Sequence, residues 1–467
     1  MENSITSTIS TAWNKSKWLV KGCIIGVIAL LLMVPMIYVN NLVFEREERQ
    51  KQATREITSK WAGKQNILPP VIGIPFWKKV GIDTSSKATY SKDIAYFLPD
   101  QVSINAQINP KEKHRGIFKV MLYDSRINIT ASFSQIPLQK LGIAPDQCIW
   151  KEAFVMMNIA DNKGLNDQLT LNWKDTTIEL SPDYANGSTA MKANLNVHSL
   201  QELSNASFSA IIDLNGSEQL LFTPVGKSTT VNISSTWKHP SFNGSTLPQN
   251  SNVKDSGFTA IWKSMSHKRN FRQEWIGNEF TFDPYTVPAT NEEHIRVDGS
   301  VVSTSPIVTS VNTVAASAFG VDLYIPVNEY QKTQRTIKYA ILCILLTFAA
   351  FFIIETGSKK SAHPFQYGLI GLALILFYTL LLSISEYTGF NIAYIISSIA
   401  TIGLIAWFVR GILDNGRSTT ILSVILVILY SYIFSLLQLK DYSLLLGSIG
   451  LFITLAAIMY FSKKLKW

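Results

Sequence analysis

Long apolar runs at the two ends of the chain enclose a polar middle. Each run has few or no formal charges inside it and approaches the roughly 20 residues that cross about 30 Å of hydrocarbon. The pattern therefore predicts six transmembrane spans, one N-terminal and five C-terminal, at 18–39, 338–355, 367–384, 390–409, 421–439 and 442–461. The first run is longer than a signal-peptide core and lacks a small-residue cleavage site after it, so we interpret it as an uncleaved anchor.

The polar middle alternates apolar and polar residues with a period of two, as half-buried strands do. The segment LPPVIGIPF at 68–76 also favours a strand, because its prolines exclude a helix. Further strands are predicted at 102–108, 118–123, 126–133, 208–214, 220–224 and 230–237, with Asn-Gly turns at 186–187, 215–216 and 243–244. We therefore expect a large inserted antiparallel β-rich domain, sandwich-like, at 66–330.

One short sequence similarity occurs within this region. RINITASF at 126–133 resembles TVNISSTW at 230–237, and a Phe precedes the central Asn by ten residues in both cases. The similarity is compatible with two related β subdomains or with two similar hairpins in one sheet system, and short isolated repeats favour the second interpretation.

The residues between the first run and the β region are strongly charged. Acids and bases alternate at helix-neighbour distances over 40–65, and Ala53, Ile57 and Trp61 recur at a spacing of four. This predicts a charged juxtamembrane helix that continues the first span as a stalk. It serves either as a solvated spacer or as a helix that transmits a signal, and mixed charge runs favour the spacer.

Basic residues in the short loops predict the orientation. The N-terminus at 1–17, the turns at 355–366 and 410–420, and the tail at 462–467 all carry Lys or Arg, so we place them in the cytoplasm. Residues 40–337 would then be periplasmic. Lys332, Arg335 and Lys338 oppose this bias, and we interpret them as headgroup contacts or as the last turn of a juxtamembrane helix.

Composition supports membrane content and shows no catalytic pattern. Only 16% of residues are charged, and the net charge of +9 comes largely from the ends of apolar runs, so we expect no nucleic acid as a partner. The histidines lack metal-ligand spacing, the three cysteines form no metal pattern, and no nucleotide or hydrolase motif occurs. We predict no catalytic, cofactor-binding or metal residues, no cofactor and no enzyme. Tyr378, Tyr430, Tyr432 and Gln438 are candidates for a small polar seam between helices.

Several segments resemble the CreD family of inner-membrane (cell envelope integrity) proteins. These are VIGIPF at 71–76, STWKHPSFNGSTLP at 235–248, SGFTAIW at 256–262, VNEYQKTQR at 327–335, KYAILCILLTFAAFFIIET at 338–356 and the stretch 361–400. The resemblance implies a bacterial inner-membrane protein whose expression is tied to a two-component system and which is linked with envelope stress and β-lactam responses. It implies no reaction and no catalytic residues.

We therefore expect a multi-pass inner-membrane protein that supports cell envelope integrity by binding or structural stabilisation rather than by catalysis. Its partners would be the lipid bilayer and an envelope component or membrane-protein partner. Two alternatives remain open, a membrane transporter or permease subunit and a sensor partner of a two-component system.

Overall fold

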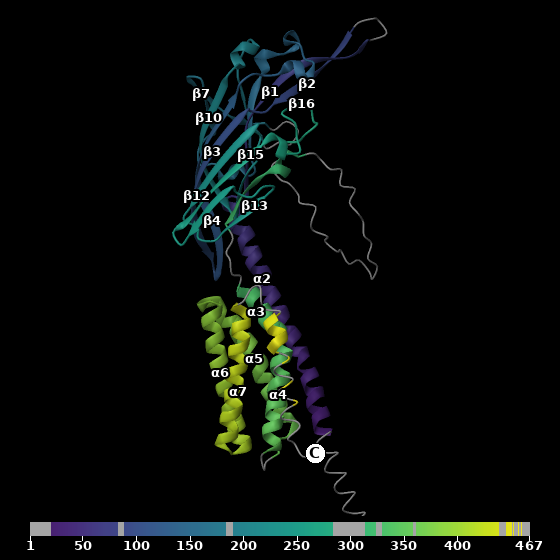
Figure 1. The fold of residues 1–467 in the computed structure, drawn as a ribbon, viewed down its shortest axis with the longest axis vertical. Helices are drawn as coiled ribbons and strands as arrows, with labels where there is room; N and C mark the ends of the chain where they lie inside the picture. Colours follow the sequence, from purple (N-terminus) through teal and green to yellow (C-terminus); the bar gives the residue numbers. More distant parts are fainter. Residues whose placement is uncertain are drawn as a thin grey trace, which may run out of the picture. The chain divides into compact units, whose positions relative to one another are not determined.

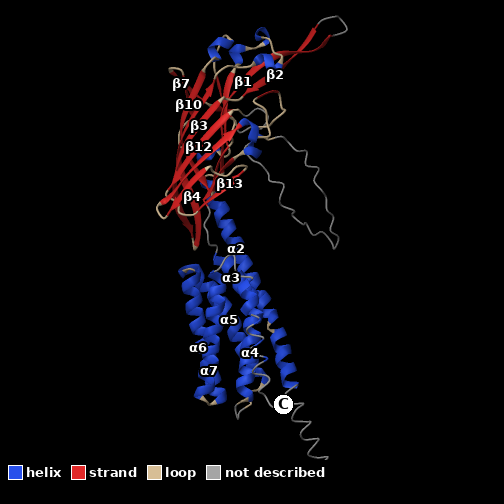
Figure 2. Ribbon diagram, viewed as in Figure 1, coloured by secondary structure: helices blue, strands red, loops and turns tan. Residues whose placement is uncertain are grey.

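The chain forms two compact units, one helical and one built from β-strands (Figures 1 and 2). The computed structural model describes residues 20–82, 88–183, 190–283, 313–323, 329–357, 361–438 and 445–450, with 452, 456 and 459. The helical unit comprises Met1–Gln52 and Val327–Trp467, and the β unit comprises Ala53–Pro326. The division falls inside the first helix, which runs over Val20–Trp61 and whose later part, Met33–Trp61, is α2.

Besides a short helical stretch at 445–450, the described residues form five further helices in the helical unit: α3 (Glu329–Lys338), α4 (Ala340–Thr356), α5 (Pro364–Thr388), α6 (Phe390–Leu413) and α7 (Gly416–Gln438). Within the same residues, four helices have the length and apolar composition to cross a membrane, or five if the bent pair of α3 and α4 is counted as one span. The sixth predicted span, 442–461, lies largely outside the described residues. The structure thus accounts for a membrane protein with four or five such helices.

The second predicted span, 338–355, largely coincides with α4, and only its first residue, Lys338, belongs to α3. The two helices meet at Tyr339 with a bend of 45°. Buried Thr333 and Thr336 donate hydroxyl hydrogen bonds to carbonyls within α3, whereas Arg335 and Lys338 are exposed. The bend lies between the amphipathic, basic helix α3 and the apolar helix α4. Charged residues are costly in hydrocarbon, so only the apolar helix is suited to the bilayer core.

Seventeen strands of described residues form two sheets in the β unit (Figure 1). Sheet A follows the order β13-β17-β11-β1-β5-β9-β8, and β2 pairs with β1 and with β16. Its strands are β1 (Gln65–Ile82), β2 (Ala88–Phe97), β5 (Phe154–Ile159), β8 (Ser181–Pro182), β9 (Met191–Asn194), β11 (Gln219–Phe222), β13 (Pro240–Gly244), β16 (Glu274–Ile276) and β17 (Phe319–Leu323).

Sheet B follows the order β14-β15-β12-β3-β4-β10-β6-β7. Its strands are β3 (Gln101–Arg115), β4 (Phe118–Phe133), β6 (Thr170–Trp173), β7 (Thr176–Glu179), β10 (Ala206–Ser217), β12 (Ser228–Ser235), β14 (Asn250–Lys254) and β15 (Gly257–Met265). Alternate residues of β3 are buried and exposed along its first eight positions, as the period-two pattern predicts.

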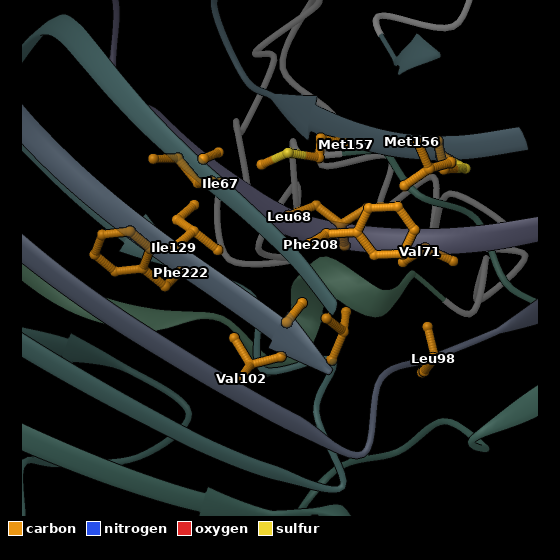
Figure 3. Packing of buried hydrophobic residues seen from close by; sticks show 14 of the residues in the cluster. Ile67, Leu68, Val71, Leu98, Val102, Ile129, Met156, Met157, Phe208 and Phe222 are labelled. Carbon is orange, nitrogen blue, oxygen red and sulfur yellow. The ribbon is translucent and has the colours of Figure 1, made fainter. Parts of the chain in front are cut away.

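One apolar core joins the two sheets (Figure 3). Ile67 and Met157 from sheet A and Ile129 and Phe208 from sheet B belong to the same buried cluster. The Trp262 ring of β15 stacks on the Phe319 ring of β17 with centroids 6.0 Å apart, which connects the sheets through aromatic packing. The sandwich-like packing predicted from the alternation is therefore present.

The prediction of purely antiparallel pairing is wrong at two places. β1 runs parallel to β11, and β12 runs parallel to β3, whereas the other strand pairs are antiparallel. Parallel neighbours need long connections, which a local alternation pattern does not reveal. The β unit is therefore a mixed-sheet structure that is mostly antiparallel.

One predicted break between strands and one predicted turn also differ from the structure. The strands expected at 118–123 and 126–133 form the single strand β4, in which Asp124 pairs with Lys111 (2.5 Å) on β3. Asn215-Gly216 lies within β10, and Gly216 faces the Tyr123 ring, which would lie 2.3 Å from any Cβ there. This glycine serves close packing rather than a turn. The 186–187 pair lies outside the described residues, and Asn243-Gly244 ends β13.

The short sequence similarity does not correspond to a duplicated hairpin. Both segments lie in sheet B, on β4 and β12, and they flank β3 from its two sides. The two phenylalanines, however, lie in different sheets, since Phe118 begins β4 and Phe222 ends β11. Both segments contribute to the same buried core.

The prolines of β1 mark a change of partner. Gln65 to Ile67 pair with β11, and from Ile72 onward the strand pairs with β2. The pairing of β1 with β5 shifts register between Leu68 and Val71, across Pro69 and Pro70. Proline has no N–H to donate to a ladder, so a bulge at this position removes the need for those hydrogen bonds.

Candidate functional site

The described residues contain no group of three or more His, Cys, Asp or Glu side chains placed to hold a metal ion. Four histidines of the β unit are exposed and scattered, at His114, His198, His239 and His267, while His294 lies outside the described residues. Five other places carry polar or reactive side chains, and at two of them residues of the first helix contact the rest of the helical unit.

The first place is a buried carboxylate at one end of the helical unit. The Glu355 side chain, at the end of α4, is 0% exposed and forms an ion pair with Lys21 of the first helix. It also accepts hydrogen bonds from the Tyr367 hydroxyl (2.6 Å), the Ala362 amide (2.6 Å) and the Ser361 hydroxyl (3.1 Å). Four donors satisfy this buried charge, and they join the first helix to α4 and α5.

The second place lies further along the first helix. Arg46 is 3.7 Å from Glu386 at the end of α5, and Glu386 accepts a hydrogen bond from the Tyr330 hydroxyl of α3 (3.2 Å). One residue later, Glu47 accepts a hydrogen bond from Gln334 (2.8 Å), also on α3. Polar groups therefore fix the first helix to the bundle twice. Neither contact was predicted from the sequence, because the partners are separated by hundreds of residues.

The four residues predicted as a polar seam do not form one group. Tyr378 and Tyr430 are buried, and both rings lie within 5 Å, centroid to centroid, of Phe377. Tyr394, which was not singled out from the sequence, joins them and donates a hydrogen bond to the Tyr430 carbonyl (2.9 Å). Tyr432 bonds instead to the Leu446 carbonyl and Gln438 to Asn391. The first pair is therefore part of an aromatic interhelical core.

The third polar site lies where the chain passes from α2 into β1. Gln65 is 1% exposed, and its amide donates to the carbonyls of Asp161 (3.0 Å) and Asn215 (3.0 Å). Its carbonyl oxygen accepts from the Asp161 amide (3.1 Å). A Cβ at Gly164 would lie 2.6 Å from the Gln65 nitrogen and 2.2 Å from the Asn215 carbonyl oxygen. We call Gln65, Asp161, Gly164 and Asn215 the stalk junction.

Contacts from the last turns of α2 support this junction. Glu56 forms an ion pair with Arg115 (2.6 Å) at the end of β3, and the Ser59 carbonyl accepts from Lys163 (3.5 Å). The Gly63 amide donates to the Asp161 carboxylate (2.9 Å). Within the β unit, the end of the stalk helix is therefore held by several elements.

The strands by which the chain enters and leaves the β unit are close neighbours. Gln65 of β1 pairs with Leu220 of β11, which in turn pairs with Val321 of β17. Since adjacent strands are about 4.8 Å apart, β1 and β17, with β11 between them, lie roughly 10 Å from each other. Among the described residues, β17 is the last strand before α3, so both connections to the helical unit leave from the same region of sheet A, as is usual for an inserted domain.

The fourth feature is an exposed polar area on one face of sheet B. Asn105 of β3 is opposite Asn128 of β4 on one side and Asn232 of β12 on the other. Neighbouring rows carry Ser, Thr, Gln and a single Arg. We call these nine residues the polar grid: Ser103, Asn105, Gln107, Arg126, Asn128, Thr130, Thr230, Asn232 and Ser234. Exposed Ile211 (57%) and Ile261 (39%) lie beside its central row.

The fifth place is Cys148, a half-buried thiol beside Phe76 of β1. Burial, aided by the negative charge of Asp146, raises the pKa of Cys148 to about 11. Because a thiolate reacts and a thiol does not, this side chain is unsuited to nucleophilic work near neutral pH.

We expect iodoacetamide to label Cys148 very slowly at pH 7 and about tenfold faster with each unit of pH until the pKa is approached. The measurement follows peptide-resolved alkylation of a variant that carries Cys23→Ser and Cys343→Ser. In urea the alkylation rate of the same thiol should reach half its maximum at the ordinary cysteine pKa of about 8.5. A half-maximal rate at that same pH in the folded protein would contradict the effect of burial on the pKa.

Comparison with known proteins identifies the family. The family model described as "Inner membrane protein CreD" matches residues 17–467. The inner membrane protein CreD of Escherichia coli (strain K12) is 28% identical over 446 residues, covering 94% of this chain and 91% of that relative. The apolar helices agree with a membrane location. The chain is thus a member of the CreD family of inner membrane proteins.

Proposed function

We propose that this protein supports cell envelope integrity and the response to envelope stress and β-lactams by binding or stabilising an envelope component rather than by catalysis. The observation that carries the proposal is the polar grid. It offers hydroxyl and amide groups on neighbouring strands of one sheet, with one charge among nine residues. Such a surface suits an extended polar partner, whereas a reaction needs groups that converge in a pocket.

The proposed topology has six spans, with residues 442–461 as the sixth, both termini in the cytoplasm and residues 40–337 in the periplasm. The polar contacts of the first helix support it. Lys21 and Arg46 are separated by 25 helical residues, or about 38 Å, close to the thickness of a bilayer with its headgroups. Reporter fusions provide the test, since one after Gln331 should be periplasmic and one after Lys360 cytoplasmic; the reverse result would contradict this topology.

Deletion of the gene is expected to sensitise cells to detergents, β-lactams and bacteriocins, and the wild-type protein should restore resistance. A variant that carries Asn105→Ala, Asn128→Ala and Asn232→Ala should be produced at normal levels, because all three side chains are exposed, yet should restore resistance poorly. The measurement is survival under each challenge together with the amount of protein in the membrane.

The matched control replaces Gln135 and Gln139 by Ala, since these exposed amide residues follow β4 and belong to neither sheet. This control should restore full resistance. Unchanged resistance of the deletion strain would argue against a role in envelope integrity, and full rescue by the grid variant would argue against the grid as the binding surface.

A transporter or permease subunit is the second candidate. The observation that favours it is Ser397 on α6, which is 0% exposed and whose hydroxyl has no hydrogen-bond partner within the described residues. Helix α6 also buries Ser398 and Thr401. Substrate flux in proteoliposomes, abolished by Ser397→Val, would support transport over binding.

A further inference from the structure

The far ends of β1 and β2 form a two-stranded ribbon that extends from sheet A (Figure 1). We call residues 77–82 and 88–92 the distal ribbon. Its pairs run from Trp77 opposite Lys92 to Ile82 opposite Ala88. Within the described part of the chain, β5 pairs with β1 only as far as Gly73, and β16 pairs with β2 only at 95–97. The distal ribbon therefore has no third strand of described residues beside it.

The distal ribbon exposes large apolar side chains. Trp77 is 47% exposed, Tyr90 is 54% exposed and Val80 is 64% exposed. Trp77 pairs with Lys92 and Lys79 pairs with Tyr90, so all four side chains share one face of the ribbon. A two-stranded hairpin is at best marginally stable in water, and exposed aromatic residues on it indicate an interaction surface.

The distal ribbon is also basic. Residues 77–92 contain four lysines and one aspartate. Two of the lysines contact acids at the base of the ribbon, Lys78 with Asp93 (3.8 Å) and Lys92 with Glu152. Lys79, nearer the tip, is exposed. Tryptophan and tyrosine beside lysine form the combination that concentrates at membrane–water interfaces.

The ribbon lies far from the point where the stalk helix enters the β unit. β1 begins at Gln65, in the stalk junction, and Trp77 follows 12 residues later on the same strand. At about 3.3 Å per residue, the two are roughly 40 Å apart. The ribbon and the connections to the helical unit therefore lie at opposite ends of β1.

We propose that the distal ribbon binds the surface of a second bilayer that carries anionic lipids, rather than the bilayer that the protein's own helices cross. The aromatic side chains enter the headgroup region, and the lysines attract the negative surface. The test separates the two bilayers, because the helices of the protein occupy a nanodisc and the added vesicles supply the second surface. This interaction is separate from the polar grid, which lies on sheet B.

The test uses the full-length protein in nanodiscs made of phosphatidylcholine. These are mixed with vesicles of phosphatidylcholine alone or with phosphatidylglycerol, and the fraction of protein that floats with the vesicles is measured. The wild type is expected to float with the anionic vesicles and not with the neutral ones. High salt should release it, because charge interactions are screened within about 3 Å at 1 M.

The variant Trp77→Ser with Tyr90→Ser is expected to bind anionic vesicles more than about tenfold more weakly, and Lys79→Gln about fivefold more weakly. Leu247→Ser with Val253→Ser is the control, because those side chains are similarly exposed elsewhere in the β unit, at 69% and 49%. Wild-type flotation that is equal with neutral vesicles, or absent with both kinds, would overturn the proposal. So would undiminished binding by the Trp77 and Tyr90 variant. The outcome of this flotation test does not affect the envelope-challenge test, so the proposed role in envelope integrity and the proposed lipid binding can be refuted independently.

Discussion

Glu355→Ala is expected to destabilise the helical unit by about 3–5 kcal/mol, the cost of removing one partner from a buried ion pair. The carboxylate has four donors, and without it Lys21, which is 12% exposed, keeps a largely buried charge with fewer acceptors. Thermal unfolding of the full chain in detergent should therefore begin at a clearly lower temperature. Less protein should also accumulate in the membrane.

Glu355→Gln tests the contribution of the charge alone, because it removes the negative charge but keeps a side-chain oxygen that accepts hydrogen bonds. Its amide oxygen can still accept from Tyr367, so its loss of stability should be smaller than that of the alanine variant. Glu45→Ala is the matched control, since Glu45 pairs with Arg49 on an exposed helix face, where both side chains are more than half exposed. That change should cost about 0.5 kcal/mol or less. Equal effects at Glu45 and Glu355 would show that the buried pair contributes no special stability.

Gly164→Val is expected to destabilise the β unit by about 3 kcal/mol at the stalk junction. A Cβ at this position would lie 2.2 Å from a backbone oxygen of Asn215, which cannot rotate away as a side chain can. Gln65 would be displaced as well, and its hydrogen bonds to Asp161 and Asn215 would weaken. Limited proteolysis should then cut the chain near the end of α2 faster than in the wild type.

Gly81→Val is the control for this experiment. Gly81 lies in β1, and apart from its chain neighbours no heavy atom of the described residues comes within 4 Å of the position that a Cβ would occupy there. The stability and cleavage rate of this variant should match the wild type. If Gly164→Val also behaved like the wild type, Gln65 would not be closely enclosed as the structure has it.

The sequence predicted the types of element better than their limits. The free energy of transferring a segment into lipid is a sum over neighbouring residues, so a local run of apolar residues is enough to predict a span. The predicted spans 367–384 and 390–409 accordingly fall within α5 and α6. The bend at Tyr339 was not predicted, because it depends on how α3 packs through Tyr330 and Thr333. Among strands, Asp124 falls between two predicted strands, 118–123 and 126–133, yet its pairing with β3 and β10 continues β4 through it.

Apart from the candidate polar seam, the sequence pointed to none of the polar sites of the structure, and the composition of these sites explains why. Each is made by residues that are distant in the chain: Lys21 with Glu355, Gln65 with Asp161, and Asn105 with Asn128 and Asn232. Individually these are ordinary charged or amide residues. Only their partners distinguish a satisfied buried charge or a surface array from a solvated side chain.

By itself, the sequence determined that apolar helices frame a β-rich domain, because hydropathy and the periods of 3.6 and 2 are local properties of the chain. The tertiary structure decided the parallel pairings of β1 with β11 and of β12 with β3, and the place of β17 beside β11. It also decided which charges of the first helix are paired. These choices depend on the packing of residues up to hundreds of positions apart, which no local pattern encodes.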